Sequence, residues 1–301
     1  MSLLVTGSVG IDTVRTPYGL NQDCIGGSAV YFSMAASYFT EVKFVGVVGD
    51  DCPFDLADLF RTKPVDLAGL EIRAGSRTFR WQGSYEGSMN EARTDAVELN
   101  VLAEQPPAVP EAFRGSEYVF LANTAPSLQM KLLDQLHNLK IVAADTMNLW
   151  IQTAGDDLKK LLGRVDLLVI NDGEAKLLTG HYNLISAARQ IIEMGPRFVV
   201  IKKGEHGSMM VDSRGNIFLL PAYPTDVVID PTGAGDSFAG GLMGYAAQVG
   251  SVDTMTLQKA IAHGTVMASF TIGDFSIHGI KNATQEMIEE RFDRLRKITQ
   301  F

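Results

Sequence analysis

DLLVINDGEAKLLTG, residues 166–180, contains the structural unit that repeats along this chain. Its first six residues are apolar at most positions, which is typical of a strand buried on both faces of a sheet. Asn171 and Glu174 follow at the spacing of a helix N-cap and its reciprocal N3 residue. A buried strand that leads directly into a helix indicates the α/β class.

Similar apolar runs, each followed by a helical pattern, occur at 3–7, 42–49, 118–123, 141–145 and 198–202. This alternation predicts a doubly wound, mostly parallel sheet flanked by helices, in a single domain over residues 1–301. Ligands of such sheets bind beyond the carboxyl ends of the strands. Polar residues lie at or shortly after these ends: Asp12, Asn123, Asp145, Asn171 and Lys202. Each alone is typical of a turn or cap, but five at one edge indicate a site.

Two segments, 11–25 and 70–101, interrupt the pattern with period-two alternation and Gly-Ser turns. We expect them to form a small antiparallel β lid. Its aromatic residues Phe79, Trp81 and Tyr85 would be an aggregation hazard if they stayed uncovered. They therefore predict either a lid over the active site or a contact in a homodimer, and both can hold together.

Composition narrows the class of protein. The formal net charge of −9 argues against nucleic acid as a partner, because phosphate backbones are bound by clustered Lys and Arg. Only Cys24 and Cys52 are present, which indicates neither a disulfide framework nor a zinc site and fits a reducing cytoplasm. The segment MSLLVTGSVG is too short an apolar run for a signal peptide or membrane span, so no membrane association is expected.

The loop VVIDPTGAGDSFAGG, residues 227–241, carries the chemistry. Gly233, Ala234 and Gly235 have little or no side chain, so their amides can surround an anion at the start of a helix. Asp236 enters the first helical turn, where the peptide dipoles favour its ionised form. An anion cradle next to a carboxylate base is what phosphoryl transfer to an alcohol requires. The alternative is a glycine-rich turn with Asp236 as an N-cap.

These residues resemble the ribokinase or PfkB family of carbohydrate and nucleoside kinases. The C-terminal D-x-T-G-A-G-D signature of that family is present as residues 230–236, and its Gly-Gly signature as Gly26 and Gly27. The N-x-x-E motif runs from Asn171 to Glu174, and the nucleotide-side turn resembles residues 202–207. The motifs occur in the family's order and cover essentially the whole chain. A P-loop motif is not present, and GSVG at 7–10 lacks the third glycine of a dinucleotide motif.

The resemblance implies a role for each matching residue. Asp236 is similar to the catalytic base, with the amides of residues 233–235 as the anion hole and Thr232 beside the transferring phosphate. Positions that resemble the nucleotide site, which would bind ATP with Mg²⁺, are Asn171, Glu174, Lys202, Gly204 and Gly207, with Glu174 reaching the metal through water. Lys202 replaces a hydroxyl residue common at that position. Acceptor-binding positions are Asp12, Gly26, Gly27, Ser28 and Asn123.

Two implied roles stay open at this point. His263 resembles a residue that passes near the adenine, although a single histidine on an apolar helix is usually a core residue. Asp230 resembles a position next to a monovalent cation, K⁺, in many family members.

The sequence says less about the acceptor. Ser28 follows the Gly-Gly signature where Lys or Asn is frequent in the family, which weakens the case for ribose or a phosphorylated sugar. The lid aromatics, with Tyr31 and Phe32, fit a flat apolar group. We therefore favour a neutral acceptor with a primary hydroxyl, namely a ribonucleoside similar to adenosine or cytidine. The alternatives are a free sugar such as ribose or fructose, a sugar phosphate that recruits lid arginines, a non-catalytic nucleotide-binding relative, and a dinucleotide-dependent oxidoreductase.

Overall fold

The computed structural model describes residues 2–300, which form two sheets and the helices around them. The main sheet has nine strands in the order β13-β12-β11-β10-β9-β8-β1-β4-β5. Their bounds are β1 Leu3–Thr6, β4 Val42–Gly49, β5 Val65–Arg73, β8 Tyr118–Leu121, β9 Ile141–Ala144, β10 Leu167–Asn171, β11 Phe198–Lys202, β12 Ser208–Asp212 and β13 Ile217–Leu220. The strands from β11 to β5 are parallel, and β12 and β13 add an antiparallel edge. The predicted sheet is confirmed, with all six expected strands.

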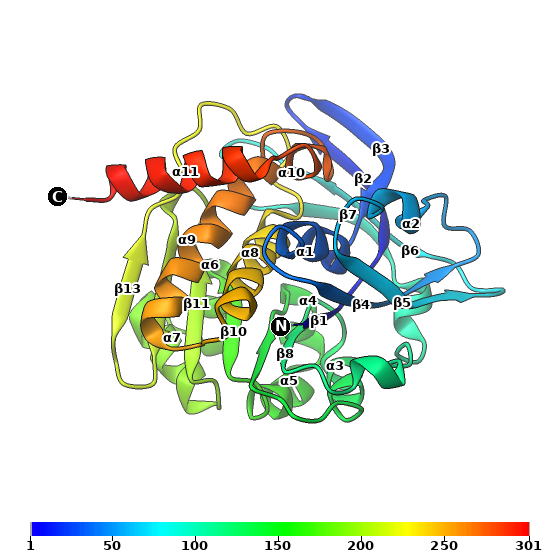
Figure 1. Ribbon diagram of the computed structural model, residues 1–301, viewed down its shortest axis with the longest axis horizontal. Helices are drawn as coiled ribbons and strands as arrows, with labels where there is room; N and C mark the ends of the chain where they lie inside the picture. Colours follow the sequence, from blue (N-terminus) through cyan, green and yellow to red (C-terminus); the bar gives the residue numbers. More distant parts are fainter. Residues whose placement is uncertain (1, 301) are drawn as a thin grey trace.

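Helices cover both faces of this sheet (Figure 1), which explains why its strands are apolar on both sides. One layer contains α1 Ser28–Ala36, α8 Ala234–Val249, α9 Thr254–Thr271, α10 His278–Lys281 and α11 Gln285–Ile298. The other contains α3 Pro126–Leu133, α5 Gly155–Leu162, α6 Asp172–Thr179 and α7 Leu184–Glu193. Two short helices, α2 Leu56–Leu59 and α4 Asn148–Thr153, lie in connections.

Small residues bring α8 close to α1 in the first layer. A Cβ atom on Gly240 would collide with the carbonyl oxygen of Phe32, and one on Gly244 would lie 3.0 Å from the Cα atom of Ala36. Beneath this contact the rings of Phe32 and Phe120 stack with their centroids 4.5 Å apart, and both side chains are fully buried. The start of α8 is thereby fixed over the carboxyl ends of the central strands.

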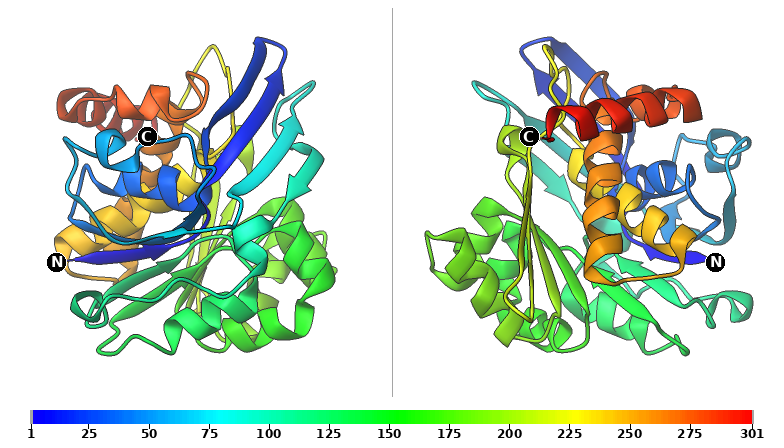
Figure 2. Two further views of the ribbon diagram at one scale, coloured as in Figure 1. Left: turned by 90° about the vertical axis from the view of Figure 1, so that its right-hand side faces the viewer. Right: turned by 60° about the vertical axis from the view of Figure 1, so that its left-hand side comes forward.

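The second sheet is the lid, with strand order β3-β2-β6-β7. Its strands are β2 Gly10–Thr16, β3 Gly19–Gly26, β6 Phe79–Ser84 and β7 Arg93–Glu98, and they extend beyond the main body (Figure 2). The β2–β3 and β6–β7 pairs are antiparallel hairpins, whereas β2 and β6, which are separated in the chain by β4 and β5, pair in parallel. Residues 70–73 belong to β5, where Leu70 pairs with Gly46, so the second lid segment begins later than expected.

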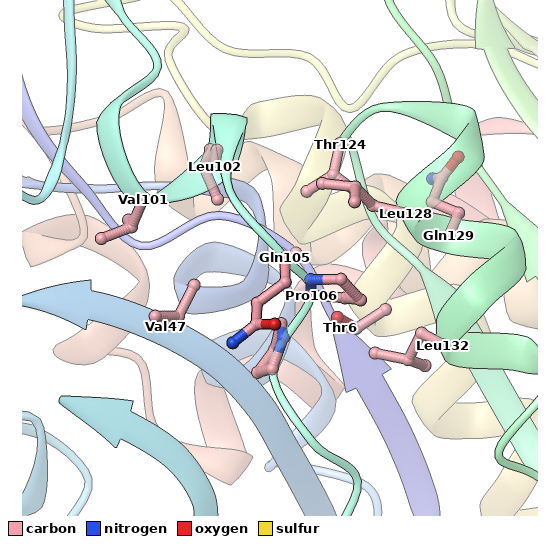
Figure 3. Close-up of a pocket in the computed structure, with 12 residues that line it drawn as sticks. Thr6, Val47, Val101, Leu102, Gln105, Pro106, Thr124, Leu128, Gln129 and Leu132 are labelled. Carbon is pink, nitrogen blue, oxygen red and sulfur yellow. The ribbon is translucent and has the colours of Figure 1, made fainter. Parts of the chain in front are cut away.

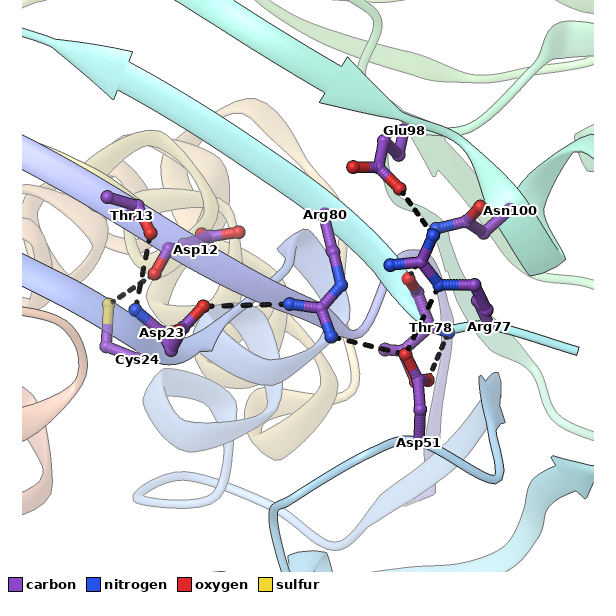
Figure 4. A network of polar contacts seen from close by, with 10 residues as sticks. All are labelled: Asp12, Thr13, Asp23, Cys24, Asp51, Arg77, Thr78, Arg80, Glu98 and Asn100. Atoms are coloured by element: carbon purple, nitrogen blue, oxygen red, sulfur yellow. Dashed lines mark hydrogen bonds and ion pairs between the residues drawn. The ribbon is translucent and has the colours of Figure 1, made fainter.

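A polar network fixes the base of the lid (Figure 4). The Arg80 guanidinium lies 3.2 Å from Asp51 and 3.6 Å from Asp23. Asp51 also accepts a hydrogen bond from the amide of Thr78 at 2.6 Å. The network joins β3 and β6 of the lid to the loop that follows β4, so the lid sheet is tied to the main sheet.

Replacing Phe32 with alanine should lower the free energy of unfolding by about 3–5 kcal/mol, because a large buried ring is removed from a close-packed layer. Denaturant titration followed by circular dichroism measures this value. Met255→Ala, at a side chain that is 72% exposed, is the matched control and should change stability by less than about 0.5 kcal/mol. A similar loss for both variants would contradict the proposed packing.

Candidate active site

Gly233 is the N-cap of α8, and its backbone has a left-handed conformation with φ of 73°. A Cβ atom at this position would collide with the ring of Tyr31, so the turn requires glycine for both conformation and space. The amide of Ala234 donates to the carbonyl of Pro231 at 3.1 Å and closes the turn. The Ala234 amide is thus engaged within the protein, so an anion hole at this loop would use the amides of Gly233 and Gly235.

Lys202 lies directly against this loop. A Cβ atom on Gly235 would be only 2.6 Å from the Lys202 Nζ atom, so a side chain at 235 would displace the ammonium group. Lys202 ends β11 and is the register partner of Asn171 at the end of β10. The strand register thus brings two of the predicted nucleotide-site residues together. The Lys202 side chain therefore points toward the loop.

Burial raises the pKa of Asp236 to about 6, while the Lys202 charge and the Asp236 backbone amide lower it. Dipoles and amides at the start of α8 were expected to keep this group ionised, but desolvation is the larger effect. The carboxylate still predominates at pH 7, and a base with a pKa near neutrality is suited to take a proton from an alcohol.

Two further carboxyl groups share this environment. Burial raises the pKa of Asp145 well above its ordinary value, and the negative charge of Asp236 adds to the effect. Burial also raises the pKa of Glu174, and in both cases Lys202 opposes the shift. The buried Oδ1 atom of Asp145 has no hydrogen-bond partner among residues 2–300. If all three carboxyl groups were ionised, one lysine would leave an excess of negative charge that a divalent cation would offset.

Glu174 and Asn171 form the predicted capping box at the start of α6. The Asn171 Oδ1 atom accepts from the Glu174 amide at 2.7 Å, and the Glu174 Oε2 atom accepts from the Asn171 amide at 2.8 Å. No cluster of three or more metal-ligating side chains is found in the described chain. The residues fit Mg²⁺ bound mainly by nucleotide phosphates and water, which is how this ion usually binds.

Asp12 marks the other end of the site. Its side chain is buried, and its Oδ1 atom has no partner within residues 2–300. Burial raises its pKa to about 8, with further contributions from the negative charges of Asp230 and Asp236. A Cβ atom on Gly26 would collide with the Asp12 carboxyl group. Gly27 has φ of 101° and lies against the Ser8 carbonyl. The Gly-Gly signature therefore makes room for a buried acid that is mostly protonated at neutral pH.

The protein itself engages the side chains of two expected acceptor residues. The hydroxyl of Ser28 lies 3.1 Å from that of Ser8, and each serine also accepts from the backbone amide of the other. Asn123 accepts from the Trp150 indole at 2.9 Å and donates to the Met147 sulfur at 3.1 Å. Ser28 thus joins the start of α1 to the β1–β2 connection, and Asn123 joins β8 to α4.

The lid reaches the signature loop through Tyr85. Its hydroxyl lies 3.4 Å from that of Thr232, and the Tyr85 ring is buried with Val14 and Met89 beneath the lid. Asp230, fully buried, accepts from the Thr232 amide at 2.9 Å and from the Ser276 amide at 3.0 Å. The sequence indicated Tyr85 only as one of three lid aromatics, because its contact with Thr232 joins residues 147 positions apart.

The nucleotide-side turn needs glycine at two positions. Gly204 has φ of 53°, and a Cβ atom there would collide with the side chain of Asn90. Gly207 has φ of 79°, and its Cβ atom would collide with the carbonyl of Leu220. Neither glycine can carry a side chain without moving its neighbours.

The structure surrounds His263 with aromatic side chains. Its imidazole is stacked between Tyr245 and Phe292, each with a centroid 4.2 Å away, and Phe39 contacts its edge. Burial lowers its pKa to about 4, so the ring is neutral. Because aromatic side chains of the protein cover both ring faces, the half-buried His263 ring has no free face on which adenine could stack, which favours the core alternative.

A small pocket lies between the end of β1, β4, the segment 101–107 and α3 (Figure 3). Its lining includes Thr6, Val47, Leu128 and Gln129, and it contains none of the predicted site residues. Its enclosed volume of about 20 Å³ suits roughly one water molecule, so it is not the site of the chemistry.

Residues 24–279 match the model of the pfkB family carbohydrate kinases. The chain belongs to this family. It is 31% identical over 255 residues to a cytidine kinase of Thermococcus kodakarensis, covering 82% of this chain and 89% of the relative. It is 24% identical to a fructokinase of Klebsiella pneumoniae, covering 83% and 86% of the two chains.

Solved structures share the fold. A nucleoside kinase of Burkholderia thailandensis in complex with inosine has a TM-score of 0.78 and 18% identity, with 98% of each chain covered. This pfkB-family protein is an ATP-dependent kinase that acts on a sugar or a nucleoside, which removes the oxidoreductase and non-catalytic alternatives. Among residues 2–300, no helix has the length and apolar character needed to cross a membrane.

Asp236→Asn should lower kcat by about 10²- to 10⁴-fold, because the amide cannot take the proton of the acceptor hydroxyl. Binding of a non-hydrolysable ATP analogue, measured by calorimetry, should persist. Asp226→Asn makes the same change at an exposed position before the signature and serves as the control. Full turnover by the Asp236 variant would refute its role as the base.

If Asp236 is the base, the pH profile of kcat/KM should rise through a pKa of about 6, since only the deprotonated carboxylate can take a proton. Lys202→Met removes the charge that lowers this pKa, so the acid limb should move to higher pH. Lys203→Met, the neighbouring substitution, should leave the limb in place. If the acid limb of the Lys202 variant does not move, Lys202 does not control the pKa of the base.

Asp12→Asn should stabilise the protein above neutral pH. The folded pKa of Asp12 is raised to about 8, so its contribution to stability is present below the ordinary pKa and is lost as pH rises toward 8. The advantage of the variant should grow between pH 4 and 8 by at most about 1.4 kcal/mol per pH unit. Urea unfolding at several pH values measures it, and a pH-independent difference would contradict the shift.

Proposed function

We propose that this kinase transfers the γ-phosphoryl group of ATP to the primary hydroxyl of a neutral ribonucleoside. The observation that carries the proposal is the proximity of three features under one lid: the Lys202 ammonium against the glycine loop, the Asp236 base, and the unpartnered acid Asp12. Asp236 is close enough to Asp12 for its negative charge to raise the pKa of Asp12, which supports an acceptor that spans the short distance between them.

In the proposed reaction, the amides of Gly233 and Gly235 and the Lys202 ammonium hold the charge of the migrating phosphoryl group. Asp236 takes the proton of the attacking hydroxyl, and Asp12 orients the acceptor through its other hydroxyls. Asn171 and Glu174 belong to the shell around the nucleotide phosphates and Mg²⁺. When bound, Mg²⁺ supplies charge neutralisation on those phosphates. Tyr85 and its lid neighbours exclude water from the acceptor.

The lid supports a nucleoside over a sugar phosphate. Val14, Tyr85 and Met89 form a buried apolar cluster with Trp81 and Val228 packed against it. The half-buried Trp81 at its edge would offer an apolar face to a flat base rather than to a polar sugar ring. The arginines that a phosphorylated acceptor would recruit are already paired with acids of the protein: Arg73, Arg77, Arg80 and Arg93. The cytidine kinase and inosine-bound nucleoside kinase relatives agree with this preference.

A free sugar is the second candidate, because the fructokinase relative is similar over most of the chain. ADP release measured with ribonucleosides, ribose, fructose and sugar phosphates distinguishes the candidates. We expect the highest kcat/KM with cytidine, adenosine or inosine. Turnover confined to phosphorylated sugars would refute the proposal, and preference for ribose or fructose would favour the alternative. Tyr85→Ala should reduce kcat/KM more for nucleosides than for free sugars.

Three accompanying proposals concern the surroundings of the site. We propose that K⁺ binds beside Asp230, where residues 229–230 and 272–276 meet through hydrogen bonds. A homodimer formed through the lid is supported by the exposed Tyr18, Leu20 and Val97 side chains. A reducing cytoplasm is consistent with Cys24 and Cys52, which are both free thiols.

A further inference from the structure

The loop between β6 and β7, residues 85–92, is here called the lid loop. Its first residues lie on the side of the proposed acceptor site. Tyr85 and Met89 lie in the buried cluster with Val14 of β2. The loop turns tightly, because the amide of Met89 donates to the carbonyl of Glu86 at 3.0 Å. Its position therefore follows the packing of the lid over the acceptor compartment.

The tip of the same loop contacts the nucleotide side. The Asn90 Nδ2 atom donates to the Glu205 Oε1 atom at 2.9 Å, and the Asn90 Oδ1 atom accepts from the Glu205 amide at 3.3 Å. Glu205 lies in the 3₁₀ turn Gly204–His206, which directly follows Lys202 and Lys203. The lid residue thus makes a two-point contact with the turn that carries the predicted phosphate-binding positions.

Two other residues extend this bridge. Tyr85 reaches Thr232 in the signature loop, and the Glu91 Oε1 atom lies 4.0 Å from where a Cβ atom on Gly173 would be, in the first turn of α6. One short loop therefore touches the segments that precede α8 and follow β10 and β11. These are the three segments assigned to the phosphates, whereas the root of the loop covers the acceptor.

We propose that Asn90 is a positioning residue that latches the lid loop to the nucleotide turn through Glu205, so that closure over the acceptor and ATP binding stabilise each other. This inference rests on the proposed function in placing the acceptor beneath the lid. Coupling between two sites requires an element whose position both ligands favour, and the latched loop is such an element. Without the latch, each half of the site would close independently.

Exchanging amide and carboxylate groups at Asn90 and Glu205 should break the latch and then rebuild it. Asn90→Asp places two carboxylates opposite each other and removes the donor, so it should open the latch. Glu205→Gln keeps an oxygen that accepts from Asn90 and should preserve it. The double variant Asn90→Asp/Glu205→Gln reverses donor and acceptor and should restore it. Asn282→Asp makes the same charge change at an exposed position outside the lid and is the control.

The first measurement is the affinity for a non-hydrolysable ATP analogue with and without saturating acceptor, by calorimetry. In the unaltered protein, acceptor should tighten analogue binding; in Asn90→Asp that gain should fall by about three- to fivefold, because the pair is exposed and its hydrogen bonds are individually modest. In Asn90→Asp, the analogue affinity measured without acceptor and the Tm should both change little. A purely structural role of Asn90 would instead change these two values. Equal coupling in all variants, or no recovery in the double variant, would overturn the latch.

The second measurement does not need an acceptor. Amide hydrogen exchange of residues 85–92 is followed with and without the ATP analogue. The analogue should protect the lid loop in the unaltered protein, the control and the double variant, but not in Asn90→Asp. Uniform protection would overturn the latch. If the unaltered protein phosphorylates no nucleoside or sugar, the proposed function fails, whereas the exchange result still decides the latch.

Discussion

The site depends on one ammonium group held among three carboxyl groups. Lys202 lowers the pKa of Asp145, Glu174 and Asp236, each of which burial raises. Without this cation, the base would be protonated over more of the neutral range. The position of the ammonium in turn requires the parallel register of β10 and β11 and the missing side chain at Gly235. The strand register, the glycine loop and the pKa values of the three carboxyl groups are therefore all linked through Lys202.

Burial and neighbouring charges also determine the protonation of Asp12, the proposed acceptor-binding residue. Asp12 has no cation next to it, and its pKa is raised by burial and by neighbouring carboxylates. Such a group is costly to ionise and costly to leave unpartnered, so it provides a driving force for binding hydroxyl groups. Arg80 of the lid does not relieve this cost, because its charge is paired with Asp51. A neutral polyhydroxylated acceptor fits this balance better than an anionic one.

The sequence predicted the main sheet and the motif positions well, because both depend on local patterns. Apolar runs followed by caps reappear as strands and helices, and the Asn171–Glu174 capping box is present as the spacing indicated. Prediction was weaker where a side chain or backbone group could contact several different partners. His263 packs in an aromatic stack, Ser28 pairs with Ser8, and the Ala234 amide closes a turn. Each outcome depends on neighbours that are far away in the chain or on backbone geometry that a motif does not specify.

By itself, the sequence determined the α/β class, the family signatures and the identity of the groups available for chemistry, since periodicity, glycine positions and motif order are local properties of the chain. Only the tertiary structure decided how those groups act on each other. The pKa of Asp236, the orientation of Lys202 and the contact of Asn90 with Glu205 all arise from burial and proximity between distant segments. Electrostatic and desolvation energies depend on distance in space, and residue order alone does not give that distance.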